Sequence, residues 1–141
     1  MKTINGNQIQ LALQDIKRVY LCGKKLSPQA FEYIENDGLE IGISDYKEFT
    51  ADAPHVHTSN NEYNIVLAGE VKVYVFEEKK EYILGKNGVF LIEPNMPYMV
   101  KAKAGTRVLF VKSPGGNDKQ LLPITSPIEH WMGTWENTMN E

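Results

Sequence analysis

The sequence has a single cysteine, Cys22, among its 141 residues. One thiol cannot form an internal disulfide, which fits the reducing environment of the cytoplasm. No histidine or second cysteine lies near Cys22 in the sequence. We therefore interpret it as a buried small apolar residue rather than as a nucleophile.

Basic residues are not in excess, since 15 Lys and Arg stand against 18 Asp and Glu, for a net charge of −3. No basic stripe is visible, so nucleic acid is not expected as a partner. No apolar run approaches the ~20 residues that span a membrane. The opening residues, MKTINGNQIQ, contain no apolar segment of a secretory signal. We therefore expect a cytoplasmic protein without a membrane partner.

The composition is that of an ordinary globular protein, with 42% apolar and 23% charged residues. The length corresponds to about one domain. We expect a single domain over 1–141, with N-terminal strands within 8–36, a barrel core at about 39–112, and a C-terminal loop and helix at 113–141.

Alternation of apolar and polar residues dominates the middle of the chain. Leu39, Ile41 and Ile43 alternate with other residues in the way that a half-buried strand requires. The expected strands lie at 39–43, 71–75, 82–84, 89–92, 98–102 and 107–111. Many short strands at this spacing predict an all-β fold, an antiparallel sandwich or barrel.

The N-terminal region is harder to assign. Apolar residues alternate over 9–13 like a strand, although those of 16–20 also fit a helical stripe. We expect short strands at 9–13 and 17–22. A short helical turn is expected after Ser27-Pro28, which are suited to the cap and the first position of a helix.

A short helix is predicted near the C-terminus, at 127–137. Residues 126–129, Ser-Pro-Ile-Glu, have the pattern of a capping box with proline at the first helical position. One face of the helix is apolar and carries Ile128, Trp131, Met132 and Trp135. This face either covers the barrel or meets a second subunit. His130 lies off this face, and we expect it to be exposed to solvent.

The stretch from His55 to Gly69, HVHTSNNEYNIVLAG, holds two of the three histidines. Alternate strand residues share a face, so the Cα atoms of His55 and His57 lie ~6.5 Å apart and their rings can converge on one ion. Residues 58–61 are turn-prone, so the next strand would run back beside the first and bring Glu62 close. Two His and one carboxylate are typical of non-haem Fe(II) sites, although Zn, Mn, Ni and Cu use such ligands. From these residue types alone, an exposed histidine pair beside an ordinary turn remains the alternative.

The spacing His55-x-His57-x4-Glu62-x6-Gly69 resembles the first motif of the cupin superfamily. In that motif two histidines and a glutamate supply metal ligands and a glycine forms a turn. The family motif begins with a glycine, where this chain has Phe49. The resemblance implies that His55, His57 and Glu62 hold a divalent transition metal: Fe, Mn, Ni or Zn.

The second cupin motif resembles residues 88–98. Many cupins read Pro-Pro-Asn-x-Pro-His there, and this chain reads Glu-Pro-Asn-Met-Pro-Tyr. The resemblance covers about 39–112 and implies a small antiparallel jelly-roll β-barrel. A pocket for a small-molecule ligand is then expected at the barrel mouth.

Tyr98 stands where the family has its fourth ligand, a histidine. A phenol has a pKa near 10 and is a poor ligand for most divalent ions unless the metal lowers that pKa. Three outcomes stay open. Three ligands hold a metal whose shell water or substrate completes, Tyr98 joins as a ligand or a hydrogen-bond donor to substrate, or the pocket holds no metal.

Strand alternation names further candidates for the substrate pocket. Asn64 shares the face of Glu62, and Val100 shares the face of Tyr98. Phe49 is placed at the rim. Asn64 equally suits a side chain that bonds to a neighbouring strand. A pocket with these side chains suits a small polar metabolite.

Three functions follow from these residues. The first is a metal-dependent oxygenase, isomerase or lyase, in which the metal activates substrate, O2 or water and Tyr98 is catalytic. The second is non-catalytic binding of a sugar or organic acid. The third is a metal-free enzyme of the sugar isomerase type, with a histidine as base and Tyr98 as acid. Because cupins are often dimers, we also expect a homodimer.

Overall fold

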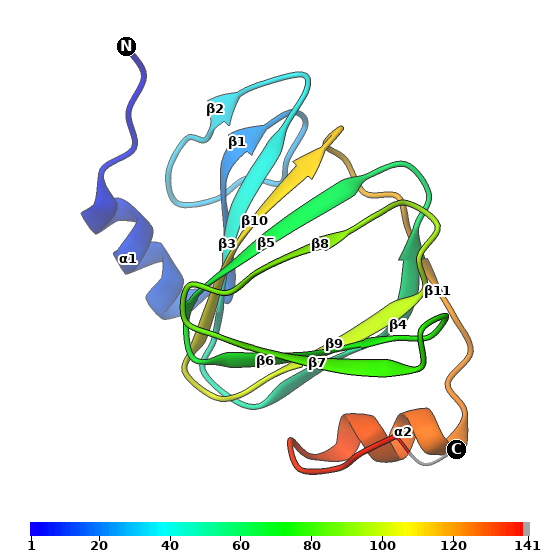
Figure 1. Cartoon of the computed structure of the whole chain (residues 1–141). Helices are drawn as coiled ribbons and strands as arrows, with labels where there is room; N and C mark the ends of the chain where they lie inside the picture. Colours follow the sequence, from blue (N-terminus) through cyan, green and yellow to red (C-terminus); the bar gives the residue numbers. More distant parts are fainter. Residues whose placement is uncertain (140–141) are drawn as a thin grey trace.

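The structure, a computed structural model, describes residues 1–139. Its strands form two sheets that face each other (Figure 1). The six-stranded sheet has the order β2-β1-β3-β10-β5-β8, with β1 Arg18–Gly23, β2 Ile34–Glu35, β3 Glu40–Tyr46, β5 Asn61–Ala68, β8 Val89–Ile92 and β10 Thr106–Ser113. The five-stranded sheet has the order β11-β4-β9-β6-β7, with β4 Thr50–His57, β6 Glu70–Val75, β7 Lys80–Gly85, β9 Tyr98–Ala102 and β11 Lys119–Leu121.

The predicted all-β antiparallel barrel with a short C-terminal helix is confirmed. The β1–β2 pair is parallel, and the other strand pairs are antiparallel. The core between the sheets consists of Val66, Val71, Val73, Val75, Ile92, Tyr98, Ala102 and Val108. Burial of one such aliphatic side chain contributes roughly 1.5–3 kcal/mol. Since Tyr98 belongs to this core, the core is continuous with the predicted site.

The strands β4 and β5 lie in different sheets, which corrects the prediction that they run side by side. β4 pairs with β9 and β11, whereas β5 pairs with β10 and β8. The turn at 58–60 therefore carries the chain from one sheet to the other. His57 and Glu62 still meet, because both point into the space between the sheets.

A helix, α1 (Gly6–Asp15), replaces the strand predicted at 9–13. The side chain of Asn5 caps its N-terminus. Leu13 is fully buried in one cluster with Val19 of β1, whereas Leu11 is 62% exposed. Burial thus follows helical spacing and not the alternation, which is why the predicted strand was wrong.

The strand predicted at 17–22 is confirmed by β1, and Cys22 is buried as expected. The helical turn predicted after Ser27-Pro28 is wrong, because residues 27–33 are irregular. The side chain of Gln29 accepts a hydrogen bond from the backbone N–H of Tyr20 at 2.8 Å and donates to its carbonyl at 2.7 Å. This pairing satisfies the backbone of β1 without a helix.

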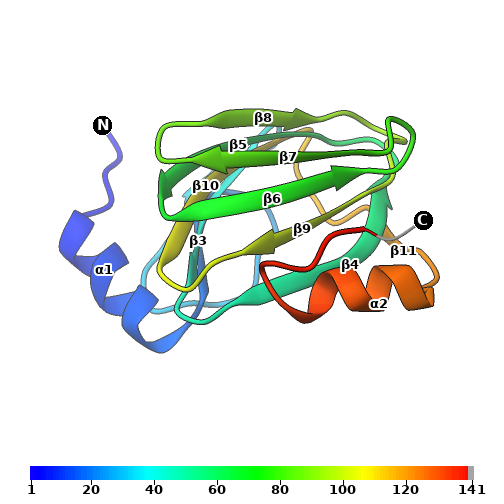
Figure 2. The same cartoon turned by 60° about the horizontal axis from the view of Figure 1, so that its bottom comes forward.

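The helix α2 (Ser126–Gly133) lies against the outer face of the five-stranded sheet (Figure 2). It is shorter than the predicted 127–137, and its N-cap is Thr125, so the predicted capping box is absent. Its apolar face covers the barrel through a cluster of Tyr74, Met99, Ile128 and Trp131. His130 is exposed, as expected.

Among the described residues, no helix is long and apolar enough to cross a membrane.

Lys101 holds the segment that follows α2. Its Nζ donates to the carbonyl oxygens of Trp131, Thr134 and Asn137, each at 2.8 Å, and lies 4.2 Å from the centre of the Trp131 ring. Three acceptors match the three hydrogens of an ammonium group. Burial, together with the nearby charge of Lys72, lowers the pKa of Lys101 to about 8. The ammonium form therefore prevails at neutral pH and caps the end of α2.

Gly69 lies between β5 and β6, where the chain again passes from one sheet to the other. Its φ of 78° is in the left-handed region, which favours glycine. An added Cβ would lie 2.6 Å from the Cα of Thr106. Gly69 is therefore required both by the backbone conformation and by the close approach of β10.

We expect Gly69→Ala to lower the free energy of unfolding by about 3 kcal/mol, because the methyl group strains the backbone and displaces Thr106. Gly105→Ala is the matched control, since Gly105 has a φ of 83° but nothing within 4 Å of an added Cβ. It should cost about 1 kcal/mol, the backbone contribution alone. Urea unfolding measures both. Equal losses would show that the contact with Thr106 is not the constraint.

Candidate functional site

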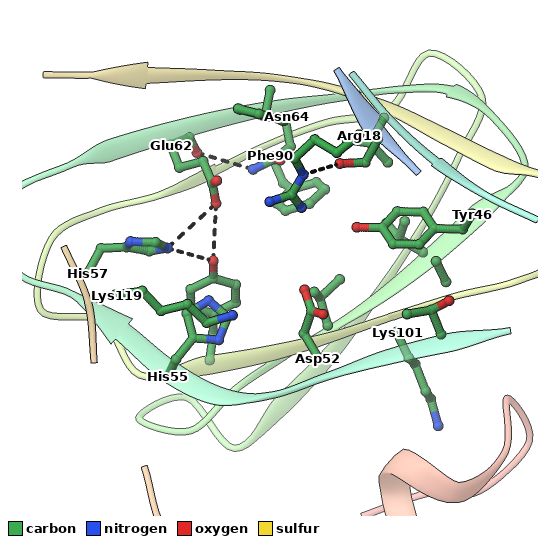
Figure 3. Close-up of a pocket in the computed structure, with 18 of the residues that line it drawn as sticks. Arg18, Tyr46, Asp52, His55, His57, Glu62, Asn64, Phe90, Lys101 and Lys119 are labelled. Carbon is green, nitrogen blue, oxygen red and sulfur yellow. Dashed lines mark hydrogen bonds and ion pairs between the residues drawn. The ribbon is translucent and has the colours of Figure 1, made fainter. Parts of the chain in front are cut away.

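A cavity lies between the two sheets, with about 720 Å³ of empty space including its open mouth. Figure 3 shows side chains from both sheets pointing toward one another, whereas Lys101 points outward. Six of the seven residues predicted for the site line it: His55, His57, Glu62, Asn64, Tyr98 and Val100. The structure therefore brings the predicted ligands and the predicted pocket residues together in one space.

Phe49 was predicted for the rim, and it does not line the cavity. It directly precedes Thr50, the first residue of β4, which does line the cavity. Neighbouring residues along an extended chain point to opposite faces, so an inward Thr50 directs Phe49 away.

The imidazole of His57 is held by a carboxylate from the C-terminal segment. Its Nδ1 donates to Oδ1 of Asp118 at 2.8 Å. Oδ2 of Asp118 accepts hydrogen bonds from the backbone N–H of Ser59 and of Asn60, at 2.7 and 2.8 Å. Because an ionised carboxylate only accepts hydrogen bonds, it keeps the hydrogen of His57 on Nδ1. The other ring nitrogen, Nε2, is left with a lone pair that faces the cavity.

The carboxyl of Asp118 stays ionised throughout the neutral range. Partial burial acts to raise its pKa, but the hydrogen bonds from Ser59, Asn60 and His57 outweigh burial and hold that pKa well below its usual range. The negative charge opposite Nδ1 is therefore permanent.

The Tyr98 hydroxyl has one hydrogen and two acceptors beside it. It donates to Oε2 of Glu62 at 3.1 Å and lies 3.1 Å from Nε2 of His57. Burial, helped by the Glu62 carboxylate, raises the pKa of Tyr98 well above its ordinary value, so the hydroxyl keeps its proton. Nε2 of His57 therefore has no hydrogen to donate to the Tyr98 oxygen, and the line Asp118–His57–Tyr98–Glu62 lacks a positive charge at this position. A proton or a metal ion at Nε2 would complete it.

His55 is held as a neutral imidazole. Its Nδ1 donates to the carbonyl of Ala53 at 2.7 Å, which leaves Nε2 with a lone pair. Burial lowers the pKa of His55, although the bond to Ala53 acts in the opposite direction. The ring lies 4.4 Å from that of Tyr98 and 5.2 Å from that of His57. His55 therefore forms part of the wall beside the hydrogen-bonded line.

The types of side chain at this site are suited to bind a divalent ion, although their arrangement is less so. Both histidines donate from Nδ1 to an oxygen, which is the arrangement of metal-ligating histidines that bind through Nε2. The grouping is less favourable. Nε2 of His57 lies 3.9 Å from Oε2 of Glu62, and the Tyr98 hydroxyl is close to both. In residues 1–139 no three His, Cys, Asp or Glu side chains are grouped to hold an ion. A metal at His55, His57 and Glu62 stays a prediction, and it requires Tyr98 to move aside.

Sequence reasoning missed several charged and polar residues of the cavity: Arg18, Ser44, Tyr46, Asp52, Lys119 and, beside it, Asp118. Ser44 and Tyr46 occupy alternate positions of β3, and such inward polar positions are the signal that could have found them. Asp52 gave no such signal. It is three residues before His55, so regular alternation places the two on opposite faces, but the register shift between them turns both inward.

Known structures share this architecture. KdgF from Halomonas sp. is 16% identical, with 72% of this chain and 80% of that chain covered and a TM-score of 0.56. A chain from the DMSP lyases RdDddP and RnDddQII is 13% identical, with 75% and 52% covered and a TM-score of 0.61. An RmlC-like cupin from Shewanella frigidimarina is 19% identical, with 59% and 72% covered and a TM-score of 0.52. This chain shares the cupin fold of these structures.

The chain also shares a segment with a curated protein. An uncharacterized RNA pseudouridine synthase from Mycoplasma capricolum is 30% identical over 91 residues. The match spans 64% of this chain but only 30% of the length of that protein. No protein-family model matches the chain. The shared segment therefore does not transfer an activity.

We expect Asp118→Asn to move the hydrogen of His57 from Nδ1 to Nε2, because an amide can donate where the carboxylate accepts. Nitrogen-15 NMR of the imidazole reads the tautomer directly. An unchanged tautomer would show that Asp118 does not set it.

The same variant has a predictable pH dependence. The folded pKa of Asp118 is depressed, so its stabilisation is complete above the unfolded pKa and lost as the pH falls toward the folded one. The gap in unfolding free energy between wild type and Asp118→Asn should be present at neutral pH and should narrow as the pH falls below about 4. Denaturant unfolding at each pH measures it.

Proposed function

We propose that this cupin is an enzyme that moves protons on a small polar metabolite in the barrel cavity. The observation that supports this most is the hydrogen-bonded line Asp118–His57–Tyr98–Glu62. Of the three functions expected from the sequence, it corresponds to the metal-free isomerase type. The DMSP lyases in the comparison are enzymes by name, but it is the hydrogen-bonded line that supports this reaction class.

His57 is the base. Asp118 keeps its Nδ1 hydrogen in place and stabilises the imidazolium that forms when Nε2 takes a proton. Nε2–H can then donate to the oxygen of Tyr98, which already donates to Glu62. Uptake of one proton therefore supplies the cation that the line lacks.

Tyr98 is the hydrogen donor to the substrate. Its pKa is raised by burial and by Glu62, so it carries a hydrogen at neutral pH. A substrate oxygen beside Tyr98 competes with Glu62 for that hydrogen once negative charge develops on the oxygen. A donor placed where charge develops lowers the barrier of the reaction.

This arrangement fits removal of a proton from a carbon next to a carbonyl group. Nε2 of His57 takes the proton as the C–H bond breaks, the electron pair forms a carbon–carbon double bond, and the carbonyl oxygen becomes an oxyanion that accepts from Tyr98. Return of the proton to the opposite face of the same carbon inverts that carbon. Return to the former carbonyl carbon, while a hydroxyl on the first carbon passes its proton to the oxyanion, moves the carbonyl group. Departure of a leaving group from the next carbon with its bonding electron pair gives elimination. None of these outcomes needs an oxidant or a reductant.

Deuterium exchange tests this proposal without knowledge of the substrate. The protein, incubated in D2O with the small-molecule fraction of a cell extract, should place deuterium on carbon in at least one metabolite, detected by mass spectrometry. His57→Gln should abolish the exchange, and Tyr98→Phe should slow it by roughly 10²–10⁴-fold. His130→Gln changes a histidine exposed on α2 and should leave the rate unaltered.

No protein-dependent exchange in any metabolite would contradict the proposal. A metabolite that the protein retains without exchange would instead support the non-catalytic binding of a sugar or organic acid.

A metal-dependent enzyme is the second candidate, favoured by the Nδ1 hydrogen bonds of both histidines. His55, His57 and Glu62 would hold Fe, Mn, Ni or Zn, with Tyr98 beside them. Such an ion supplies Lewis acidity toward a substrate oxygen, or activates water or O2. In this case Asp118 orients His57 as a ligand rather than as a base.

Elemental analysis separates the two candidates. After incubation with Fe(II), Mn(II), Ni(II) or Zn(II) and removal of excess metal, a metal enzyme retains about one ion per chain. His57→Ala and Glu62→Ala should then reduce retention at least tenfold, His130→Ala should not, and Tyr98→Phe should retain at least as much as wild type. Wild type that retains no metal would contradict this candidate and favour the proton-moving one.

We further propose a cytoplasmic homodimer with a small molecule as its main ligand, as the sequence predicted. Exposed Tyr63, Val89 and Leu91 on the outer face of the six-stranded sheet offer an apolar contact between copies.

A further inference from the structure

We propose that the cavity contains a second subsite, built on Arg18, that binds the carboxylate of the substrate, and that the substrate is a small hydroxy acid. This inference rests on the proposed function, because it assumes that the cavity receives a metabolite. Figure 3 shows Arg18 and Tyr46 on one side of the cavity and His57 with Glu62 on the other. The two groups can therefore contact different parts of one ligand.

Arg18 enters the cavity from β1 and is fixed there by two contacts. Its Nε donates to Oγ of Ser44 at 2.9 Å, and its guanidinium carbon lies 5.2 Å from the centre of the Phe110 ring. The side chain is accessible to solvent although it lies within the barrel, because it faces the open cavity. A guanidinium bonded through Nε and supported on a ring presents its outer nitrogens in a fixed orientation.

Arg18 carries a charge that the Tyr46 side chain and, at longer range, the Asp52 carboxylate act on. Over residues 1–139 no carboxylate oxygen lies within 4.0 Å of its guanidinium nitrogens. The other arginine of the chain, Arg107, is bonded to Asp45 at 3.0 Å. Lys112, which also lines the cavity, is paired with Glu40 at 3.5 Å. An arginine is always charged, so one that lines a cavity with no carboxylate in direct contact is suited to bind an anionic ligand.

A carboxylate matches this charge better than a phosphate does. The planar guanidinium offers parallel N–H groups to the two oxygens of one carboxylate. Tyr46 stands beside Arg18, and burial together with the Asp52 charge raises its pKa, so its hydroxyl remains a donor. One guanidinium and one phenol hydroxyl are enough to bind the single negative charge of a carboxylate.

Asp52 indicates the rest of the ligand. Its carboxylate lines the cavity and forms no ion pair within 4.0 Å in the described part of the chain, although its charge acts on Arg18 and Tyr46 at longer range. A second anion cannot be its partner, whereas a hydroxyl group can donate to it. A ligand with a carboxylate at Arg18 and a hydroxyl at Asp52 is a hydroxy acid. Lys119, exposed at the mouth, favours the entry of such an anion.

Matched pairs of probes test the subsite. Gluconate is compared with sorbitol, glucuronate with glucose, galacturonate with galactose, and lactate with 1,2-propanediol, each titrated by calorimetry. We expect at least one acid to bind ten times more tightly than its neutral counterpart. Because the chain has two arginines, their side-chain nitrogen NMR signals locate the ligand. The Arg18 signals should shift on titration, and those of Arg107 should not.

Variants complete the test. Arg18→Met should weaken binding of the acid at least tenfold, and Arg107→Met, the matched control outside the cavity, should leave it within twofold. Arg18→Lys keeps the charge but loses the paired N–H groups, and it should weaken binding severalfold even if Arg18→Met fails to fold. Melting temperatures report folding in each case.

Several results would overturn the inference: no acid binds, an acid binds equally well without Arg18, or phosphate esters bind in preference. The results also distinguish an error in the Arg18 subsite from an error in the proposed enzyme function. Binding through Arg18 without deuterium exchange would support the subsite and contradict the enzyme. Exchange on a neutral metabolite, unaffected by Arg18→Met, would support the enzyme and overturn the subsite.

Discussion

The site depends on one carboxylate, that of Asp118. It accepts hydrogen bonds from the turn between β4 and β5, at Ser59 and Asn60, and from the ring of His57. The same charge thus joins the two sheets to the segment that enters β11 and sets which nitrogen of His57 carries hydrogen. A neutral acceptor would close the turn but would not hold the ring as a base. Stability at this end of the barrel and the chemistry of the cavity therefore share one interaction.

The two candidate functions compete for the same lone pair. Nε2 of His57 faces a hydroxyl that already donates to Glu62, so the position lacks positive charge. A proton taken from a substrate supplies this charge for part of a reaction cycle, whereas a bound metal supplies it permanently. The protein cannot use His57 as a base and as a ligand at once. The choice turns on Tyr98, whose hydroxyl lies 3.1 Å from Nε2 and has to move aside for an ion to enter.

The features that local alternation controls were predictable from the sequence, and those that depend on distant partners were not. His55 and His57 face the cavity because they share one face of a strand, and a short turn brings Glu62 to them. The helix α1 was missed because alternation and helical spacing overlap over a few residues, and only packing against β1 decides between them. Arg18 and Asp118 were missed because nothing adjacent in the sequence marks a cavity. They reach the site through strand order, which no short motif encodes.

The strand β9 faces two ways. Tyr98 and Val100 line the cavity, whereas Met99 and Lys101 contact the C-terminal segment on the outside of the barrel. A ligand that presses on this wall therefore presses on the same backbone that anchors α2. We therefore expect the rigidity of the cavity wall to depend on a C-terminal segment that lies outside the barrel.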